Sequence, residues 1–393
     1  QMSILNLGTY PPKQCGIATF SMDLRRSLLK NNCDVKVMTV SDENYQYTYP
    51  SEVLFDIKQN NKKNYTKAAK FINTSNAAQL VIIQHEYGIY GGEDGDYILE
   101  LTRRLHKPYV VVTHTVLPQP SKHQKHVLNQ LCQNAAAVVC MTRKSAELLS
   151  NLYEAPGELI HVIPHGVPEF KKQSTNLLKK WYGLEGREII STFGLIGPGK
   201  GLELAIEAVA PLVDDWPQLC YMILGQTHPM LQKYEGEKYR NMLEDKVHSL
   251  GLQDNVCFVN KYLSDEEIGE YLYMTDIYLS PYPNKDQAVS GTMAFAVGCG
   301  RAIVSTSYAY ATEVLADKRG LLALSSEPEE LSQLIRSLLM DEALKTRLQN
   351  RSLELGKSWT WVNVGKQYRN LFKQVLDNNY ISEEHFLSYG DRK

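Results

Sequence analysis

Residues 191–201 read STFGLIGPGKG; they overlap an apolar run at 188–193 and lead into a helical pattern at 202–212. The apolar run has the length and the β-branched content of a buried strand. The glycines and the proline after it predict a tight loop, and Lys200 stands where the helix opens. Because free backbone N–H groups at the start of a helix favour anions, this pattern predicts that Gly199 and Lys200 bind phosphate.

The same alternation of apolar runs and helical patterns extends along the chain in both directions. Before this stretch, strand-like runs lie at 3–8, 34–40, 80–84, 109–113, 135–141 and 159–163, with helical patterns at 17–29 and 144–152. After it, runs lie at 219–224, 256–259, 277–280 and 302–305, with helical patterns at 237–250, 264–274, 291–297 and from 327 onward. Strands that are apolar throughout and alternate with helices indicate a parallel sheet covered on both faces. Two such series predict an α/β chain of two doubly wound, Rossmann-like domains that face a central cleft, where a ligand binds.

The length of 393 residues suits two domains of about 150–200 residues each. We expect an N-terminal domain at 1–168, a polar, lysine-rich linker at 169–187 and a C-terminal domain at 188–358. The segment 359–393 is expected to be helical and, with Trp361 and other aromatic residues on one face, to pack back on the N-terminal domain.

The composition excludes several classes of protein. A net charge of -2 lacks the basic excess of a general nucleic-acid binder. Seven cysteines without CxxC spacing argue against a disulfide framework and a zinc site, and favour a reducing compartment. No apolar run of about 18 residues or more is long enough to span a membrane, and no signal segment stands at the start. A cytoplasmic protein is expected, and the weakly basic stretch 122–126 leaves peripheral contact with the inner face of a membrane open.

Several motifs in fixed order give the chain a family resemblance. Residues 191–208 resemble the start of the donor-binding domain in glycosyltransferase family 4, and VCFV, DIYLSP, GCGRAIV and EVL follow in the family's order at 256–259, 276–281, 298–304 and 313–315. Gly16-Ile-Ala, VTH at 112–114 and VIPHG at 162–166 match the N-terminal domain. The resemblance implies the GT-B fold, with an acceptor-binding domain followed by a donor-binding domain.

The same resemblance implies a retaining transfer of a sugar from a nucleotide-sugar donor to a saccharide or lipid-linked saccharide acceptor. The chain looks closest to the mannosyltransferase-like branch, which favours a hexose, mannose from GDP-mannose. A glucosyl- or other hexosyltransferase that uses a UDP-sugar is the alternative.

The chain departs from the family at three positions. The family commonly carries two glutamates, one for the sugar hydroxyls and one for the ribose, where this chain has Gln287 and Phe295. Leu195 replaces the arginine that usually follows the first glycine. We therefore expect Asp286 and Gln287 to bind the donor sugar, because carboxylate and amide groups make the paired hydrogen bonds that distinguish hydroxyls.

Other donor-binding residues come from strand ends and helix starts. Ser290, Gly291 and Thr292 open a helix and are expected to bind phosphate, although a serine there also suits a simple N-cap. Thr227 and His228 follow the run at 219–224 and are expected at the diphosphate, with a plain turn as the alternative. The resemblance adds further positions: Gly16 at the phosphate, and Lys261, Tyr262 and Glu313 at the nucleoside.

Two residues after strands of the first domain are candidate catalytic groups beside Lys200. His114 ends the apolar run at 109–113, and the resemblance places it near the acceptor, where it would position a hydroxyl or relay a proton. A satisfied structural histidine is the alternative. Glu86 is expected to bind the acceptor, or else to cap the glycine-rich loop at 91–95.

We expect no metal and no cofactor. Asp94-Gly-Asp96 resembles the metal-binding Asp-x-Asp of the other main glycosyltransferase fold, but in a GT-B protein Lys200 and helix N-termini take the place of the metal. A nicotinamide-dependent oxidoreductase would need a Gly-x-Gly-x-x-Gly turn followed by an acidic residue, which this chain lacks. A non-catalytic sugar-binding protein does not explain two helix starts suited to phosphate.

Overall fold

The computed structural model describes residues 1–43 and 46–390, with side chains described through residue 379. It divides into two compact units, which we describe separately. Unit 1 contains residues 1–166 and 361–393, and unit 2 contains residues 167–360.

Within its described residues, unit 1 is built on a parallel sheet in the order β3-β2-β1-β4-β5-β6-β7. The strands are β1 (Met2–Gly8), β2 (Cys33–Ser41), β3 (Val53–Lys58), β4 (Leu80–His85), β5 (Tyr109–Thr113), β6 (Ala137–Cys140) and β7 (Ile160–Val162). The helices are α1 (Gly16–Lys30), α2 (Lys62–Thr74), η1 (Glu93–Gly95), α3 (Ile98–Thr102), α4 (Lys122–Gln133), α5 (Arg143–Asn151), η2 (Gly157–Leu159) and α15 (Trp361–Gly390). Helices α2 to α5 pack on one face of the sheet, and α1 packs against α15.

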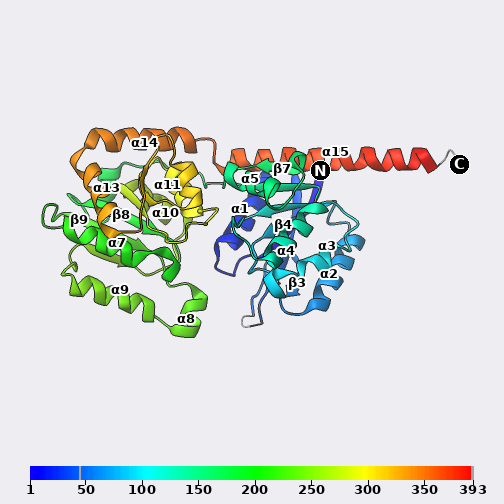
Figure 1. Cartoon of the computed structure of the whole chain (residues 1–393), viewed down its shortest axis with the longest axis horizontal. Coiled ribbons are helices and arrows are strands. Elements are labelled where there is room, and N and C mark those ends of the chain that lie inside the picture. The colour runs from blue at the N-terminus through cyan, green and yellow to red at the C-terminus, as the bar shows by residue number, and fades with distance from the viewer. Residues whose placement is uncertain (44–45, 391–393) are drawn as a thin grey trace. The chain divides into compact units, whose positions relative to one another are not determined.

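Unit 2 is built on a second parallel sheet, in the order β10-β9-β8-β11-β12-β13. The strands are β8 (Glu188–Phe193), β9 (Leu219–Leu224), β10 (Val256–Val259), β11 (Ile277–Ser280), β12 (Ala302–Thr306) and β13 (Leu321–Ala323). The helices are α6 (Thr175–Trp181), η3 (Pro198–Lys200), α7 (Leu202–Val209), η4 (Ala210–Leu212), α8 (Pro229–Glu235), α9 (Lys238–Ser249), α10 (Asp265–Met274), α11 (Gly291–Gly298), α12 (Ala309–Val314), α13 (Pro328–Met340) and α14 (Glu342–Gly356). Two apolar clusters, one on each face of the sheet, form its core, and Figure 1 shows the helices on both sides of the strands.

The order of the strands reverses once in each sheet. In unit 1 the reversal lies between β1 and β4, and in unit 2 it lies between β8 and β11. Loops that leave neighbouring strands at such a point turn in opposite directions and open a crevice at the carboxyl ends of the strands, where ligands bind. The predicted α/β fold with two doubly wound domains is therefore confirmed, and each unit has one such position.

The structure corrects the expected linker at 169–187. This segment contains α6 and belongs to unit 2, where α6 packs against α10. Lys179 is buried rather than solvated, because its ammonium group pairs with Asp276 at 2.6 Å and also bonds to the carbonyl of Arg187. The high lysine content of the segment therefore does not mark an exposed connection.

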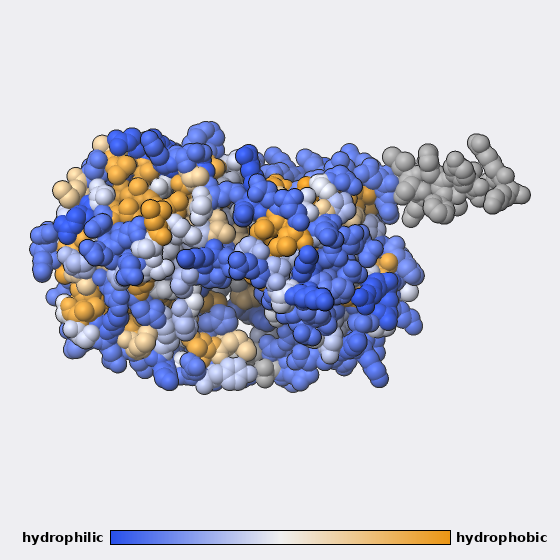
Figure 2. All heavy atoms as spheres, viewed as in Figure 1, coloured by the Kyte–Doolittle hydropathy of each residue, from blue (hydrophilic) through white to orange (hydrophobic). Residues whose placement is uncertain are grey.

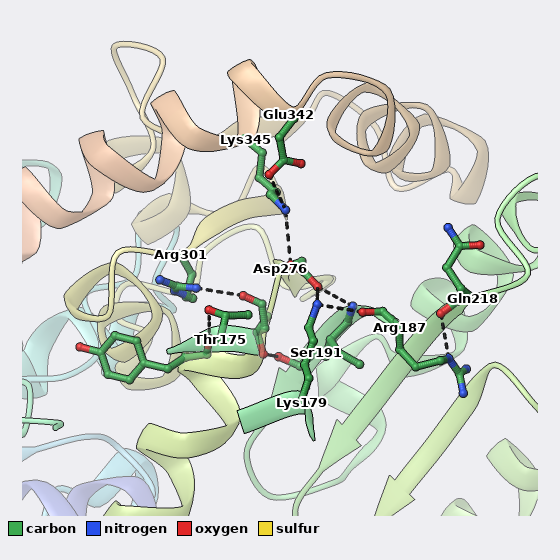
Figure 3. A network of polar contacts seen from close by, with 12 residues as sticks. Thr175, Lys179, Arg187, Ser191, Gln218, Asp276, Arg301, Glu342 and Lys345 are labelled. Carbon is green, nitrogen blue, oxygen red and sulfur yellow. Dashed lines mark hydrogen bonds and ion pairs between the residues drawn. The ribbon is translucent and has the colours of Figure 1, made fainter. Parts of the chain in front are cut away.

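Asp276 is the centre of a buried polar network. Lys179 reaches it from α6 and Lys345 from α14, the latter at 3.3 Å, and its carboxylate also accepts the backbone N–H of Ile189 at 2.8 Å. Figure 3 shows the two lysines directed at this carboxylate from different elements. The network joins α6 and α14 to the amino ends of β8 and β11, so it lies at the opposite edge of the sheet from the loops that follow the strands.

Figure 2 shows hydrophilic residues over much of the face drawn, with apolar patches between them. Among the described residues, no helix combines the length and the apolar character needed to cross a bilayer.

Candidate functional site

Three neighbouring strands of unit 2 deliver the predicted donor-binding loops to one edge of the sheet. Gly194 follows β8 with φ 137°, and Gly225 follows β9 with φ 139°. A Cβ atom added to Gly225 would lie 1.9 Å from the carbonyl oxygen of Gly194. Both positions therefore require glycine, which keeps this edge free of bulky side chains.

The Lys200 loop packs against the loop after β11. Gly201 has φ 66°, and a Cβ atom there would lie 2.0 Å from the carbonyl oxygen of Pro281. A Cβ atom on Gly197 or Gly199 would meet nothing within 4 Å, so the chain's own packing does not require these two glycines. Because Gly197 and Gly199 have no side chains, a ligand can approach the backbone of the loop.

The charge of Lys200 is available to a ligand. Its Nζ lies 5.0 Å from the centre of the Tyr282 ring, and no carboxylate of the described residues forms an ion pair with it. Helix α7 begins directly after the loop, and its N-cap, Gly201, has no side chain to occupy the free N–H groups. A cation and uncapped amides at one helix start are suited to an anion such as a diphosphate.

The start of α11 joins this group through Tyr282. The hydroxyl groups of Tyr282 and Thr292 lie 2.9 Å apart, and those of Ser290 and Thr292 lie 3.2 Å apart. Ser290 is the N-cap of α11 and accepts the backbone N–H of Met293. Ser290 therefore fills the N-cap role given as the simpler alternative, while Gly291 and Thr292 lie at the same strand-end edge as Lys200. Tyr282 was missed by the sequence analysis, since nothing local to it marks its contact with the Lys200 loop.

An open pocket of about 500 Å³ lies beside the loop. It is lined by Leu195, Gly197, Pro198, Gly199, Lys200, His228, Met230, Leu231, Tyr234 and Glu235. His228 is the N-cap of α8, and its Nδ1 accepts the N–H of Met230 at 3.2 Å. The structure therefore places His228 and Lys200 around the same pocket, and the contact of His228 with a diphosphate stays a prediction.

Thr227 is placed differently from its predicted role at the diphosphate. Its side chain is buried and its hydroxyl donates to Glu237 at 2.6 Å, so it does not line the pocket. Glu237 also pairs with Arg240, whose guanidinium donates to the carbonyl of Gly225. This small network fixes the loop after β9, which makes Thr227 a supporting residue of the pocket.

The expected sugar- and nucleoside-binding residues lie around α12 and α10. The backbone carbonyl of Gln287 accepts the N–H of Tyr310 at 3.0 Å, which fastens the Asp286-Gln287 loop to the start of α12, the helix that carries Glu313. The Gln287 amide group donates to the carbonyl of Val289 at 3.0 Å, and Asp286 is exposed.

Lys261 and Tyr262 follow β10 and do not line the pocket beside Lys200. Lys261 forms an ion pair with Glu267 of the capping box at the start of α10, and Tyr262 is 50% exposed. The structure therefore does not bring these two expected nucleoside ligands to Lys200.

Phe295 is a core residue. It is buried, it stacks on Phe193 with ring centres 5.9 Å apart, and it meets Phe170 edge-on at 5.6 Å. The Phe295 ring has no hydrogen-bonding group for a ribose, and its aromatic contacts hold it in the core. The departure from the family pattern at 295 is thus a packing feature of this chain.

In unit 1, His114 forms the end of a buried chain of hydrogen bonds. Its Nε2 lies 2.8 Å from Gln84 Oε1, and Gln84 Nε2 donates to Asn6 Oδ1 at 3.0 Å. Phe20 meets the imidazole edge-on at 4.8 Å. Burial, together with smaller contributions from the neighbouring His165 and His85, lowers the pKa of His114 to about 3. The imidazole is therefore neutral at physiological pH.

Gln84 and Asn6 were missed by the sequence analysis, although a signal exists. Each is a buried amide in a strand that is otherwise mostly apolar, and a buried amide needs a hydrogen-bonding partner. Glu86, after β4, accepts the N–H of Gly88 at 2.8 Å and so closes its own turn rather than capping the loop at 91–95. Gly16, the first residue of α1, is exposed and has open space where a Cβ atom would stand.

An acidic cluster surrounds His123 of α4. Its Nδ1 lies 3.0 Å from Asp94 and its Nε2 lies 3.5 Å from Asp96, while Glu93 lies at 4.0 Å. The hydrogen bond to Asp94 raises the pKa of His123. Glu93, Asp94 and His123 place one ligand atom each within 4.8 Å of one another, a spacing that could hold a metal ion. Salt bridges between η1 and α4 account for the same arrangement.

Comparison with known protein families matches both units. A family model described as glycosyl transferases group 1 matches residues 175–354, and one described as glycosyltransferase family 4 matches residues 15–169. A 2-deoxystreptamine glucosyltransferase of Streptomyces kanamyceticus is 27% identical over 54% of this chain and 53% of that protein. Mannosylfructose-phosphate synthase of Agrobacterium fabrum is 22% identical over 58% of this chain and 51% of that protein. The chain thus spans about half the length of these curated relatives.

Solved structures show the same fold. Sucrose-phosphate synthase of Thermosynechococcus elongatus has a TM-score of 0.79 at 15% identity, over 96% of this chain and 100% of that chain. Anabaena HepE in complex with UDP and glucose has a TM-score of 0.74 at 15% identity, over 95% of this chain and 100% of that chain. At such low identity the likeness establishes the fold alone.

Proposed function

Because this chain belongs to glycosyltransferase family 4, we propose that it transfers a hexosyl group from a nucleotide-diphosphate sugar to a hydroxyl of a saccharide or lipid-linked saccharide acceptor. The observation that carries the proposal is the group formed by Lys200, Tyr282 and Thr292 at the strand-end edge of unit 2. It offers a cation without a carboxylate partner among the described residues, next to two helix starts.

This group suits the leaving diphosphate. Negative charge grows on the diphosphate as the glycosidic bond breaks, and preorganised donors that face growing charge stabilise the transition state. Lys200 supplies a positive charge, and the first N–H groups of α7 and α11 supply aligned backbone dipoles. Asp286 and Gln287 bind the hydroxyls of the donor sugar in this proposal.

For the donor we propose mannose from GDP-mannose, on the motif order that resembles the mannosyltransferase-like branch. A UDP-hexose is the second candidate, since HepE forms complexes with UDP and with UDP-glucose, and a relative from Streptomyces kanamyceticus is a glucosyltransferase. Retention of the anomeric configuration belongs to the proposal through the family.

A donor screen tests these proposals. The purified protein is incubated with GDP-mannose, UDP-glucose and other nucleotide sugars in the presence of saccharide acceptors, and release of nucleoside diphosphate is followed. NMR coupling constants of the product report its anomeric configuration. Thermal unfolding with nucleoside diphosphates, NADH and free sugars adds a binding readout, because a specific ligand raises apparent stability. Stabilisation by NADH and not by any nucleoside diphosphate would contradict the proposal.

The diphosphate can be neutralised by Lys200 with backbone N–H groups or by a bound metal ion, and metal dependence of the activity distinguishes the two. Lys200 and the backbone N–H groups supply the positive potential, so excess EDTA should leave turnover nearly unchanged. The measurement is initial rate with and without chelator, followed by addition of Mg²⁺ or Mn²⁺. Loss of activity with EDTA and rescue by metal would direct attention to Glu93, Asp94 and His123, and Asp94→Asn should then abolish the rescue.

We expect different residues to recognise the ribose and the sugar of the donor. Phe295 is buried in the core, so we propose that Glu313 accepts the ribose hydroxyls and that Gln287 selects the sugar. A hydrogen bond to a carboxylate contributes about 1.5–3 kcal/mol, so Glu313→Gln should weaken binding of the nucleoside diphosphate about ten-fold or more. Gln287→Ala should mainly change the preference among donor sugars. Calorimetric titration with the diphosphate and with the intact donor measures both, and wild-type diphosphate affinity in Glu313→Gln would contradict the ribose assignment.

A further inference from the structure

Three neighbouring strands of unit 1 carry a chain of polar side chains that leads to His114. Asn6 lies in β1, Gln84 near the end of β4, and His114 directly after β5. The side chains of Asn6 and Gln84 are fully or almost fully buried. The chain crosses the position where the strand order of the sheet reverses, so it lies where the fold places a ligand.

The direction of the hydrogen bonds follows from the chemistry of the groups. Gln84 Nε2 donates to Asn6 Oδ1 at 3.0 Å, which turns Gln84 Oε1 toward the imidazole. A carbonyl oxygen can only accept, so the contact of 2.8 Å requires a hydrogen on His114 Nε2. A neutral imidazole has one N–H group. The lone pair of His114 is therefore on Nδ1, which has no hydrogen-bond partner among the described residues.

The surroundings keep the imidazole neutral. Burial lowers the pKa of His114 to about 3, with smaller contributions in the same direction from His165 and His85. Phe20 of α1 closes another side of the ring. The groups that face His114 are thus apolar or neutral, and its basicity is too low for it to take a proton fully from a hydroxyl.

The Gln84 side chain has little freedom to turn. A Cβ atom on Gly8 would lie 2.9 Å from Gln84 Cβ, so the backbone of β1 stands directly against it. The hydroxyl of Tyr90 donates to the backbone carbonyl of Gln84 at 2.5 Å and fixes that end of β4. The Nδ2 atom of Asn6 is buried without a hydrogen-bond partner among the described residues, a cost that an apolar residue at this position would avoid.

We propose that Gln84, oriented by Asn6, is a positioning residue that holds His114 with its proton on Nε2 and its lone pair on Nδ1, ready to accept a hydrogen bond from a sugar hydroxyl. The inference rests on the proposed function and deepens it. Of the two roles expected for His114, orientation of a hydroxyl and proton relay, it selects the first. Gln84 acts through His114 and does not itself touch the substrate.

The first test is spectroscopic and needs no activity. Long-range ¹H–¹⁵N NMR of protein labelled at the histidine ring nitrogens distinguishes the two neutral tautomers, and His114→Asn identifies the His114 signals. The wild-type protein should show the proton on Nε2. A proton on Nδ1 would overturn the proposal. If the tautomer is the expected one but no donor is used, the proposed function fails while the description of the tautomer stands.

Two variants of matched size test the consequence for turnover. Gln84→Met removes the acceptor and should allow both tautomers, with kcat about 10-fold lower and the affinity of unit 2 for nucleoside diphosphate unchanged. Gln84→Glu keeps an acceptor oxygen and should retain the tautomer and most of the activity at alkaline pH. The added carboxylate should raise the pKa of His114, so activity should fall as the pH drops through that pKa and Nδ1 becomes protonated. The wild-type protein should lack this acid limb.

The outcomes separate positioning from simple packing. A packing role predicts equal losses in both variants, no change of tautomer and no new acid limb, and this result would overturn the proposal. Unchanged kcat and unchanged tautomer in Gln84→Met would do the same. If Gln84→Met fails to fold, which thermal unfolding detects, the wild-type spectrum and the pH profile of Gln84→Glu still decide.

Discussion

Replacing Lys200 with alanine should lower kcat about 100-fold or more, the range seen when one preorganised donor is removed from a charge-stabilising site. The ammonium group lies over the Tyr282 ring and has no carboxylate partner among the described residues, so its charge is not neutralised before the donor binds. Its attraction to the diphosphate grows as the leaving group takes up charge. The loss should therefore appear mainly in kcat, with a smaller rise in the KM for the donor.

Steady-state rates at saturating acceptor, with the donor varied, measure this effect. Lys357→Ala is the matched control, because Lys357 is an exposed lysine of unit 2 that pairs with Glu354 at 2.7 Å, next to α14. Lys200→Arg keeps the positive charge but spreads it over a planar guanidinium group, so this variant should retain part of kcat. Activity of Lys200→Ala within a factor of about three of wild type would rule out the phosphate role.

The fold was predictable from the sequence wherever a strand is apolar along its whole length. The central strands β1, β4, β8 and β9 are almost entirely buried, so their runs are unmistakable. Two of the four edge strands of the described sheets, β3 and β13, were missed. β3 contains exposed and half-buried residues and β13 is short, because an edge strand is covered less than a central one.

The candidate site was predictable where one short motif carries it. Gly199 and Lys200 stand in a strand–loop–helix pattern that is visible without any partner. Tyr282 and Gln84 were missed because their meaning comes from residues on other strands, Lys200 for the first and His114 for the second. Sequence distance hides such contacts, and only the register of the sheet reveals them.

The prediction of a linker at 169–187 was wrong for the same reason, a contact between residues that are far apart in the sequence. The lysines near residue 175 suggest a solvated segment, but Lys179 meets a carboxylate almost one hundred positions later in the chain. A buried charge needs a counter-ion, and no carboxylate near Lys179 in the sequence pairs with it. The structure shows that Asp276 does, and this pairing has a large expected effect on stability.

Replacing Asp276 with alanine should lower the free energy of unfolding of unit 2 by about 3–5 kcal/mol. The change leaves the ammonium group of Lys179 buried without its counter-ion, and it removes the bond to the N–H of Ile189. Lys345 keeps Glu342 as a partner, so Lys179 contributes most of the cost. Asp215→Ala is the matched control, since its pair with Arg336 is exposed and should be worth less than about 1 kcal/mol.

Urea unfolding of the variants, followed by tryptophan fluorescence, gives the midpoint and the slope of each unfolding transition. Each transition is analysed separately, because the two units need not unfold together. Hydrogen exchange at the amide of Ile189 provides a local readout of the same network. The combined change Lys179→Met, Asp276→Leu, Lys345→Met should recover much of the stability, because a buried charge cluster can be replaced by apolar side chains of similar volume but cannot safely lose one member. If Asp276→Ala is no more destabilising than Asp215→Ala, the cluster is solvated in solution, and the burial of Lys179 does not explain why α6 belongs to unit 2.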